Sequence, residues 1–133
     1  MKAVSDERRA YAADGAPEAI GPYSHAVAAR GFLFCSGQIQ LDPATGELAG
    51  GDAASQAVRC LENLEAVCAS AGASLADAVR CTIYMTDLGD FAAVNDAYAA
   101  FFGEQPPSRV TVGVAALPRG AQVEIEAIVA VDG

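Results

Sequence analysis

A helix ends and a strand begins within the stretch Gln105-Pro-Pro-Ser-Arg109-Val-Thr-Val-Gly-Val114. Two consecutive prolines cannot continue a helix, so they end the aromatic-rich segment before them. After the prolines, valines at 110, 112 and 114 alternate with Arg109, Thr111 and Gly113. This period of two predicts a strand whose valine face lies in the core.

The other face of this strand carries a guanidinium, a hydroxyl and a bare backbone position, a set suited to a small anionic ligand. Arg109 offers a planar fork of donors that matches a carboxylate. The alternative is a solvated arginine at the edge of a strand, and this stretch alone leaves both interpretations open.

The 133 residues suffice for one domain with its own core, and 53% apolar against 19% charged residues indicates a globular protein. We expect a flexible arm at residues 1–8 and a single domain at residues 9–133. The N-terminus has no apolar segment, and no apolar run approaches the ~20 residues that span a membrane. These features predict a cytoplasmic protein without a membrane partner.

The net charge of −9, with eight scattered Lys and Arg residues, disfavours nucleic acid as a partner. Four cysteines, at positions 35, 60, 68 and 81, show no metal-binding spacing, and the chain has one histidine. We therefore expect no metal site, and we interpret the cysteines as buried apolar residues in a reducing compartment.

Periodicity predicts the element order βββ-α-β-α-ββ, hence a two-layer α+β domain with two helices on one face of a mixed sheet. Asp52 is a good N-cap for the first helix, which ends at Gly72. Gly37, inside a strand pattern, indicates a bulge or a close backbone approach. The apolar stripe of the second helix consists of Phe91, Val94, Tyr98 and Phe101. The sheet face away from the helices is too apolar for water alone, which favours a homo-oligomer.

Glu124 and Glu126 share one face of the last strand, close enough to disturb each other's proton affinity. They are either an exposed charged edge or a pair of which one carboxylate orients a water beside Arg109.

Three other polar residues are ambiguous when taken singly. Tyr23 follows Gly-Pro, a turn that aims the phenol into a cleft unless the residue is an ordinary half-buried tyrosine. His25 lies two residues after Tyr23, so it falls on the same face of the predicted strand as Tyr23. We interpret it as structural or supporting. Asn95 borders the apolar stripe of the second helix, where asparagines are more often packing residues than ligand contacts.

Taken together, these residues belong to five motifs in a fixed order. The motifs are Ile20-Gly-Pro-Tyr-Ser24, Ser36-Gly-Gln-Ile39, Asp87-Leu-Gly-Asp-Phe91 with Val94-Asn95, Pro107-Ser-Arg109 and Val123-Glu-Ile-Glu-Ala127. The set resembles the Rid (reactive intermediate deaminase, or YjgF) family over about residues 14–131. The resemblance implies a chorismate-mutase-like fold and a homotrimer with a central β-barrel and ligand clefts between neighbouring subunits. Such an assembly would cover the apolar second face of the sheet.

The best-known members of that family hydrolyse 2-imino acids, or enamine tautomers such as 2-aminoacrylate, to 2-oxo acids and ammonia. The resemblance implies that Arg109 holds the substrate carboxylate, that Glu124 positions the water and that Tyr23 completes the catalytic set. The substrate-binding residues that it implies are Arg109, Tyr23, Ser36, Gly37, Asn95 and Thr111. An imine carbon is already electrophilic, so orienting the substrate and one water suffices and we expect no cofactor.

The sequence departs from the family pattern in three places: Thr111 stands where many members have cysteine, the segment between Phe102 and Arg109 is a few residues short, and His25 is titratable. Two alternatives to a general deaminase therefore stay open. One is a specialised imine or enol substrate in a biosynthetic pathway, and the other is a non-catalytic regulator that binds small 2-oxo acids.

Overall fold

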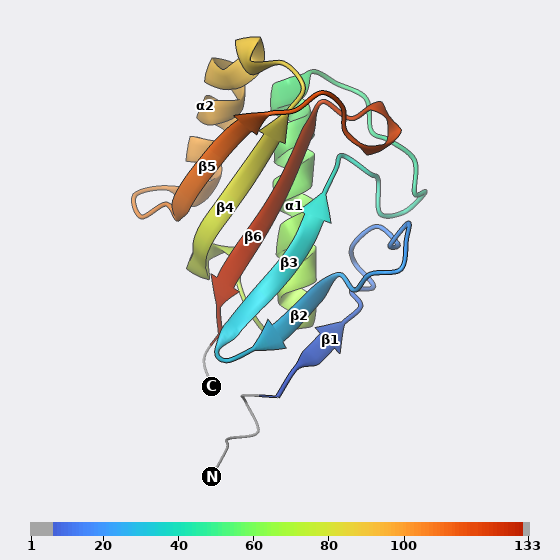
Figure 1. Ribbon diagram of the computed structural model, residues 1–133, viewed down its shortest axis with the longest axis vertical. Coiled ribbons are helices and arrows are strands. Elements are labelled where there is room, and N and C mark those ends of the chain that lie inside the picture. Colours follow the sequence, from blue (N-terminus) through green and yellow to red (C-terminus); the bar gives the residue numbers. More distant parts are fainter. Residues whose placement is uncertain (1–6, 132–133) are drawn as a thin grey trace.

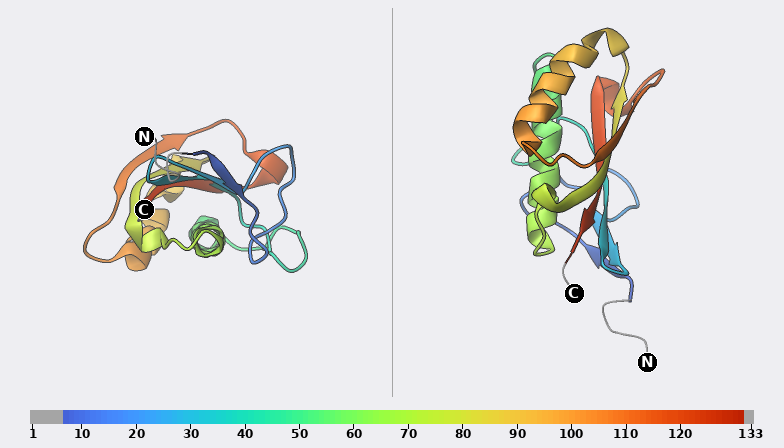
Figure 2. Two further views of the ribbon diagram at one scale, coloured as in Figure 1. Left: turned by 90° about the horizontal axis from the view of Figure 1, so that it is seen from below. Right: turned by 90° about the vertical axis from the view of Figure 1, so that its left-hand side faces the viewer.

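A six-stranded sheet with the strand order β1-β2-β3-β6-β4-β5 forms one layer of the computed structural model, which describes residues 7–131 (Figure 1). The strands are β1 (Arg9–Tyr11), β2 (Ala26–Ala29), β3 (Phe32–Gln38), β4 (Ala78–Met85), β5 (Ser108–Gly113) and β6 (Val123–Ala130). The helices α1 (Ala53–Ser70) and α2 (Phe91–Phe102) lie together on one face of the sheet (Figure 2). Since β4 and β5 are parallel while the other pairs are antiparallel, the predicted mixed sheet and two-layer α+β class are confirmed.

Helix α1 follows the sequence pattern closely. Asp52 is the N-cap, and its side chain accepts a hydrogen bond of 2.9 Å from the backbone N–H of Ser55. The face towards the sheet buries Leu61, Leu64 and Val67 completely. All four cysteines are free and buried, as expected of small apolar residues, and burial raises the pKa of the Cys60 thiol.

Helix α2 differs from its predicted stripe in one respect. Val94 and Tyr98 are buried, but Phe91 and Phe101 are exposed, and Phe102 packs against the core instead. Steps of four residues from Val94 to Tyr98 to Phe102 follow one side of a helix, whereas Phe101 is rotated away from it. The helix is preceded by a short 3-10 turn at Leu88–Asp90, which the Asp87 side chain caps.

The predicted orientation of β5 is wrong. Arg109 pairs with the buried Cys81 of β4, and Thr111 pairs with the buried Ile83. Residues paired across a ladder point to the same side of the sheet, so Arg109 and Thr111 face the helices. The side of Gly113 agrees, because a Cβ there would meet Leu88 at 3.2 Å. The valines of β5 therefore lie on the open face and not in the core.

The open face of the sheet carries exposed apolar side chains, as predicted, beside the polar Glu124, Glu126 and Tyr84. Phe32 and Phe34 on β3 are 40% and 47% exposed there, and β6 and β5 add Ile128 and the valines at 110 and 112. Within residues 7–131, neither α1 nor α2 lies on this face (Figure 2). The homotrimer and its barrel stay predictions.

The predicted arm at residues 1–8 lies outside the described residues except for Glu7 and Arg8. Across residues 7–131, neither helix combines the length and the apolar composition that crossing a membrane requires.

Candidate active site

A β-bulge in β3 shapes the site. Cys35 pairs with Ala127 and Gln38 pairs with Ile125, so β3 has one residue more than β6 between the two pairs. The extra residue falls at Ser36–Gly37, which confirms the bulge predicted there. A Cβ on Gly37 would lie 2.6 Å from Oε2 of Glu124, so the carboxylate occupies the space that a side chain would fill.

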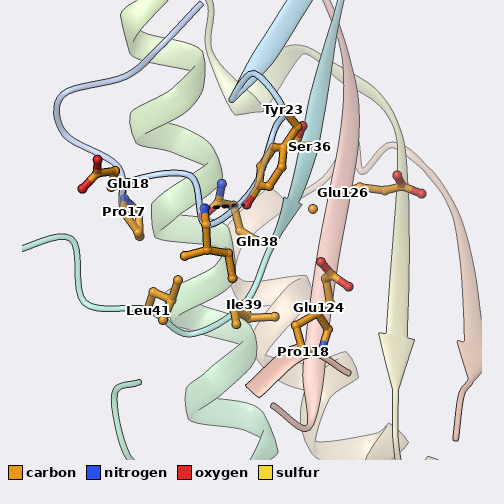
Figure 3. Close-up of a pocket in the computed structure, with 12 residues that line it drawn as sticks. Pro17, Glu18, Tyr23, Ser36, Gln38, Ile39, Leu41, Pro118, Glu124 and Glu126 are labelled. Atoms are coloured by element: carbon orange, nitrogen blue, oxygen red, sulfur yellow. Dashed lines mark hydrogen bonds between the residues drawn. The ribbon is translucent and has the colours of Figure 1, made fainter. Parts of the chain in front are cut away.

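Beside the bulge lies a cavity of about 420 Å³, which we call the glutamate pocket. It is bounded by the loop at residues 13–23, by β3 and by β6 (Figure 3). Its lining residues are Pro17, Glu18, Ile20, Tyr23, Ser36, Gly37, Gln38, Ile39, Leu41, Pro118, Glu124 and Glu126. The pocket therefore brings together four of the predicted site residues: Tyr23, Ser36, Gly37 and Glu124.

The two glutamates of the pocket have different surroundings. Burial raises the pKa of Glu124, and the charge of Glu126 raises it further. Glu126 accepts a hydrogen bond of 2.5 Å from the hydroxyl of Tyr84 across the β4–β6 ladder, and this bond raises the pKa of Tyr84 to about 12. Figure 3 shows the Glu124 carboxylate beside the bulge and the Glu126 carboxylate directed away from it. Glu124 is thus the carboxylate free to meet a ligand.

The Gly-Pro turn presents Tyr23 at the opposite side of the pocket. Its backbone N–H donates to the carbonyl of Gly21 at 2.9 Å, and its hydroxyl accepts from the N–H of Ile20 at 3.4 Å. The side chain is 45% exposed. The hydroxyl of Ser36 donates to the carbonyl of Ser24 at 2.7 Å, which fixes the chain next to Tyr23 onto β3.

Arg109 lies elsewhere, against the aromatic rings of α2. Its guanidinium carbon is 4.9 Å from the ring centroid of Tyr98 and 5.6 Å from that of Phe91. Asn95 is half-buried. It lies four residues after Phe91 and three before Tyr98, so it falls on the same face of α2, between the two rings. The only salt bridge within residues 7–131 joins Arg59 to Glu62, so no described carboxylate pairs with Arg109.

Thr111 completes this second group, which we call the arginine cluster: Phe91, Asn95, Tyr98, Arg109 and Thr111. Its hydroxyl oxygen is buried with no hydrogen-bond partner in the described part of the chain. The N–H of Val114 donates to the carbonyl of Met85 on β4. Because the direction of the backbone N–H and C=O groups alternates along a strand, those of Val112 and Val110 also point towards β4. The backbone N–H and C=O groups of Arg109 and Thr111 point away from β4, and because β5 is the last strand of the sheet they lie along its free edge.

One chain does not bring the two groups together. Glu124 pairs with Tyr84, and Tyr84 with Val112, all on the open face, whereas Arg109 faces the helices from the edge strand. The single site expected from the sequence is thus divided between two faces of the sheet. Tyr98 was missed as the ring beneath Arg109, although the spacing of Phe91, Asn95 and Tyr98 along one helix face could have indicated it.

Among residues 7–131, no three His, Cys, Asp or Glu side chains are placed to hold a metal ion.

Comparisons with known proteins show what the whole chain is similar to. Residues 13–131 match the family described as Endoribonuclease L-PSP. The chain is 56% identical over 123 residues to Protein DfrA of Myxococcus xanthus, covering 91% of this chain and 94% of that protein. It is 43% identical over 121 residues to the 2-iminobutanoate/2-iminopropanoate deaminase of Capra hircus, covering 91% and 88%. The crystal structure of RidA from the Antarctic bacterium Psychrobacter sp. PAMC 21119 has a TM-score of 0.85 at 45% identity, covering 89% and 95%.

Proposed function

The chain belongs to the endoribonuclease L-PSP family, which is the Rid or YjgF family, and on that premise we propose that it hydrolyses reactive 2-imino acids to 2-oxo acids and ammonia. The similar protein of Capra hircus is named for this reaction. The observation that carries the proposal is the Glu124 carboxylate, which lies beside the backbone of Gly37 in a pocket shared with Tyr23.

In the proposed reaction, the water oxygen attacks the carbon of the N-protonated imine as Glu124 takes one of the water's protons. The resulting carbinolamine carries both a hydroxyl and an amino group on that carbon. Glu124 then returns the proton to nitrogen. As the C–N bond breaks and ammonia leaves, Glu124 takes the proton of the hydroxyl group, and the carbonyl of the 2-oxo acid forms. A raised pKa suits Glu124 to this double role, because a carboxyl group that holds its proton more tightly is a better base for water.

We propose further that the arginine cluster of one subunit completes the glutamate pocket of a neighbour in a cyclic trimer. The cluster lies at the β5 edge, and the pocket opens beside the apolar open face. A contact between the edge of one copy and the open face of the next is heterologous, and such contacts form a ring when the rotation from copy to copy closes, as in the trimer that we propose. Arg109 would then bind the substrate carboxylate with a planar fork, while Thr111 offers free backbone groups.

RNA is not the substrate that we propose, despite the family's description. A net charge of −9 with dispersed cations provides no track for a phosphate backbone. Ribonuclease activity that copurifies with the protein and disappears in an Arg109→Ala variant would overturn this part of the proposal.

The test of the main proposal is ammonia release while an amino-acid oxidase generates 2-imino acids in the same cuvette. We expect the protein to accelerate ammonia and 2-oxo acid formation well beyond spontaneous hydrolysis, and we expect Glu124→Gln to abolish the acceleration. Equal rates with and without the protein, for imines of small and large side chains, would refute it.

A specialised substrate is the alternative that deserves the same assay. The relative from Myxococcus xanthus, at 56% identity, carries a name that specifies no reaction. Activity confined to one imine among those supplied would favour this alternative over a general deaminase.

A further inference from the structure

His25 is buried beside the glutamate pocket, with 6% of its surface exposed, and it has two polar partners. The backbone N–H of Ala13 donates to Nδ1 at 2.7 Å, and Nε2 lies 2.7 Å from the carbonyl oxygen of Pro17. An amide N–H only donates and a carbonyl only accepts, so Nδ1 must be the acceptor and Nε2 must carry the hydrogen. The partners therefore select one neutral tautomer of the ring.

Both partners lie in the 13–23 loop, which has no regular secondary structure. This loop supplies Pro17, Glu18, Ile20 and Tyr23 to the wall of the pocket (Figure 3). Few other hydrogen bonds hold its first half; the N–H of Ala16 reaches the carbonyl of Ala13 only at 3.4 Å. The His25 ring is thus the principal polar tie between this loop and the sheet.

The backbone of His25 is fixed in turn by the bulge. The N–H of Ser36 donates to the carbonyl of His25 at 3.0 Å, and the hydroxyl of Ser36 donates to the carbonyl of Ser24 at 2.7 Å. His25 therefore connects two parts of the pocket. Its backbone is bonded to the bulge, where the Glu124 carboxylate lies against Gly37, and its side chain is bonded to the loop that carries Tyr23.

We propose that His25 is a positioning residue: its Nε2–H tautomer holds the 13–23 loop against β3 so that Tyr23 faces Glu124 across the pocket. His25 touches neither carboxylate and takes no part in the chemistry. The inference deepens the proposed deaminase function, on which its kinetic consequence rests, but the tautomer and the loop's order do not depend on that function. Glutamine is the informative substitute, because its carboxamide offers a donor group (NH2) and an acceptor oxygen, as the Nε2–H tautomer of the ring does.

The first measurement concerns the wild-type protein alone. His25 is the only histidine, so a long-range ¹H–¹⁵N correlation spectrum of the imidazole needs no assignment. We expect the pattern of a single Nε2–H tautomer at neutral pH. An Nδ1–H tautomer, or the average of both, would overturn the inference.

The second measurement compares His25→Gln with His25→Leu, which fills the space without polar groups. We expect the leucine variant to lose about tenfold or more in kcat/KM, mainly through KM, and the glutamine variant to stay within about threefold of wild type. Amide hydrogen exchange should accelerate across residues 13–23 in the leucine variant while α1 stays protected. Equal exchange in that loop for wild type and the leucine variant, or equal kinetic losses in both variants, would overturn the inference.

The outcomes also separate the two proposals. If wild type shows no deaminase activity but the tautomer and the exchange pattern are as expected, the proposed function fails and the positioning role of His25 stands. If the leucine variant does not fold, the tautomer of wild type and the exchange pattern of the glutamine variant decide, with protection of residues 13–23 expected in the latter and its loss counting against the inference.

Discussion

The missing side chain at Gly37 leaves the space that the Glu124 carboxylate occupies, so a single methyl group there tests the site. In Gly37→Ala the new Cβ would lie 2.6 Å from Oε2 of Glu124. The carboxylate is the end of a flexible side chain and can move away at little cost to folding. We expect kcat/KM for imine hydrolysis to fall by about tenfold or more, with a melting temperature close to wild type.

Gly50→Ala is the matched control, because a Cβ at Gly50 would meet nothing within 4 Å. We expect this variant to keep both activity and melting temperature. Wild-type turnover in Gly37→Ala would show that the position of the Glu124 carboxylate is irrelevant to the reaction.

The pair of glutamates predicts a pH effect. Burial is the main cause of the raised pKa of Glu124, and the charge of Glu126 adds to it. Glu126→Gln removes the second cause while leaving an oxygen to accept from Tyr84. If ionised Glu124 takes the proton from water, the acid limb of the kcat/KM profile should move to lower pH in this variant and stay in place in Glu126→Asp. A limb that moves to higher pH would contradict the assignment.

Stability should respond with the same sign. A carboxyl group whose pKa is raised in the folded state binds its proton more tightly there than in the unfolded chain. Its contribution to the free energy of unfolding is therefore present below the unfolded pKa and is lost as pH rises through the folded pKa. Glu126→Gln brings the two values for Glu124 closer, so urea melts across this range should show a shallower decline than in wild type.

Arg109 combines a planar fork with a stacked position on Tyr98. Lysine keeps the charge but not the fork, and a charge-assisted hydrogen bond contributes about 1.5–3 kcal/mol, so Arg109→Lys should lower kcat/KM by about 10- to 100-fold. Arg109→Ala should lower it further and also remove a cation–π contact of about 0.5–1 kcal/mol. Steady-state assays with 2-iminopropanoate and parallel thermal melts give both numbers. An alanine variant that folds and keeps wild-type turnover would make Arg109 a surface charge only.

At the scale of elements, the sequence predicted local geometry better than orientation. The hairpin between β2 and β3 turns at Arg30 and Gly31, whose positive φ angles of 55° and 84° suit a two-residue turn. The cap of α1 and the bulge at Gly37 were likewise readable, because each depends on a few neighbouring residues. Such features need no knowledge of what packs against them.

The side to which β5 turns its valines depends on distant packing. Alternation divides a strand into two faces but does not say which one meets the helices. Here the side chain of Arg109 lies on the side of the sheet that faces the helices, and its guanidinium stacks on aromatic rings of α2. A long charged side chain can pack in this way through its methylene groups, which composition alone does not reveal. Their apolar character predicts that the valines on the other side lie in the core, but they belong to a face that a second copy is proposed to cover.

The free edge of β5 yields a prediction for Thr111. Its backbone groups point away from β4, and its buried hydroxyl has no described partner. Thr111→Cys exchanges the hydroxyl for a thiol and removes the γ-methyl group, but it breaks no described hydrogen bond and leaves the backbone in place. Thr111→Cys should match wild type within about twofold in kcat/KM and melt at the same or a slightly higher temperature. A gain of tenfold in activity would show that a thiol at this position takes part in the reaction.

At the scale of the whole molecule, the division of the candidate site between two faces has a consequence for mixed assemblies. Arg109→Ala and Glu124→Gln should each be inactive alone. In a ring where each site takes its arginine from one subunit and its glutamate from the next, random 1:1 assembly of the two variants restores about one quarter of the sites. The same fraction is expected when wild type is mixed 1:1 with the double variant, because both neighbours must again contribute an intact residue.

A site contained within one chain gives different numbers. The two single variants would then complement nowhere, and the mixture of wild type with the double variant would retain about one half of wild-type activity. Subunits can be randomised by refolding from denaturant, with sedimentation used to check that the product is a trimer. Activities near one quarter in both mixtures support a shared site, whereas zero and one half would require Arg109 and Glu124 to act from the same chain. Because their strands hold them on opposite faces of one sheet, we expect the first result.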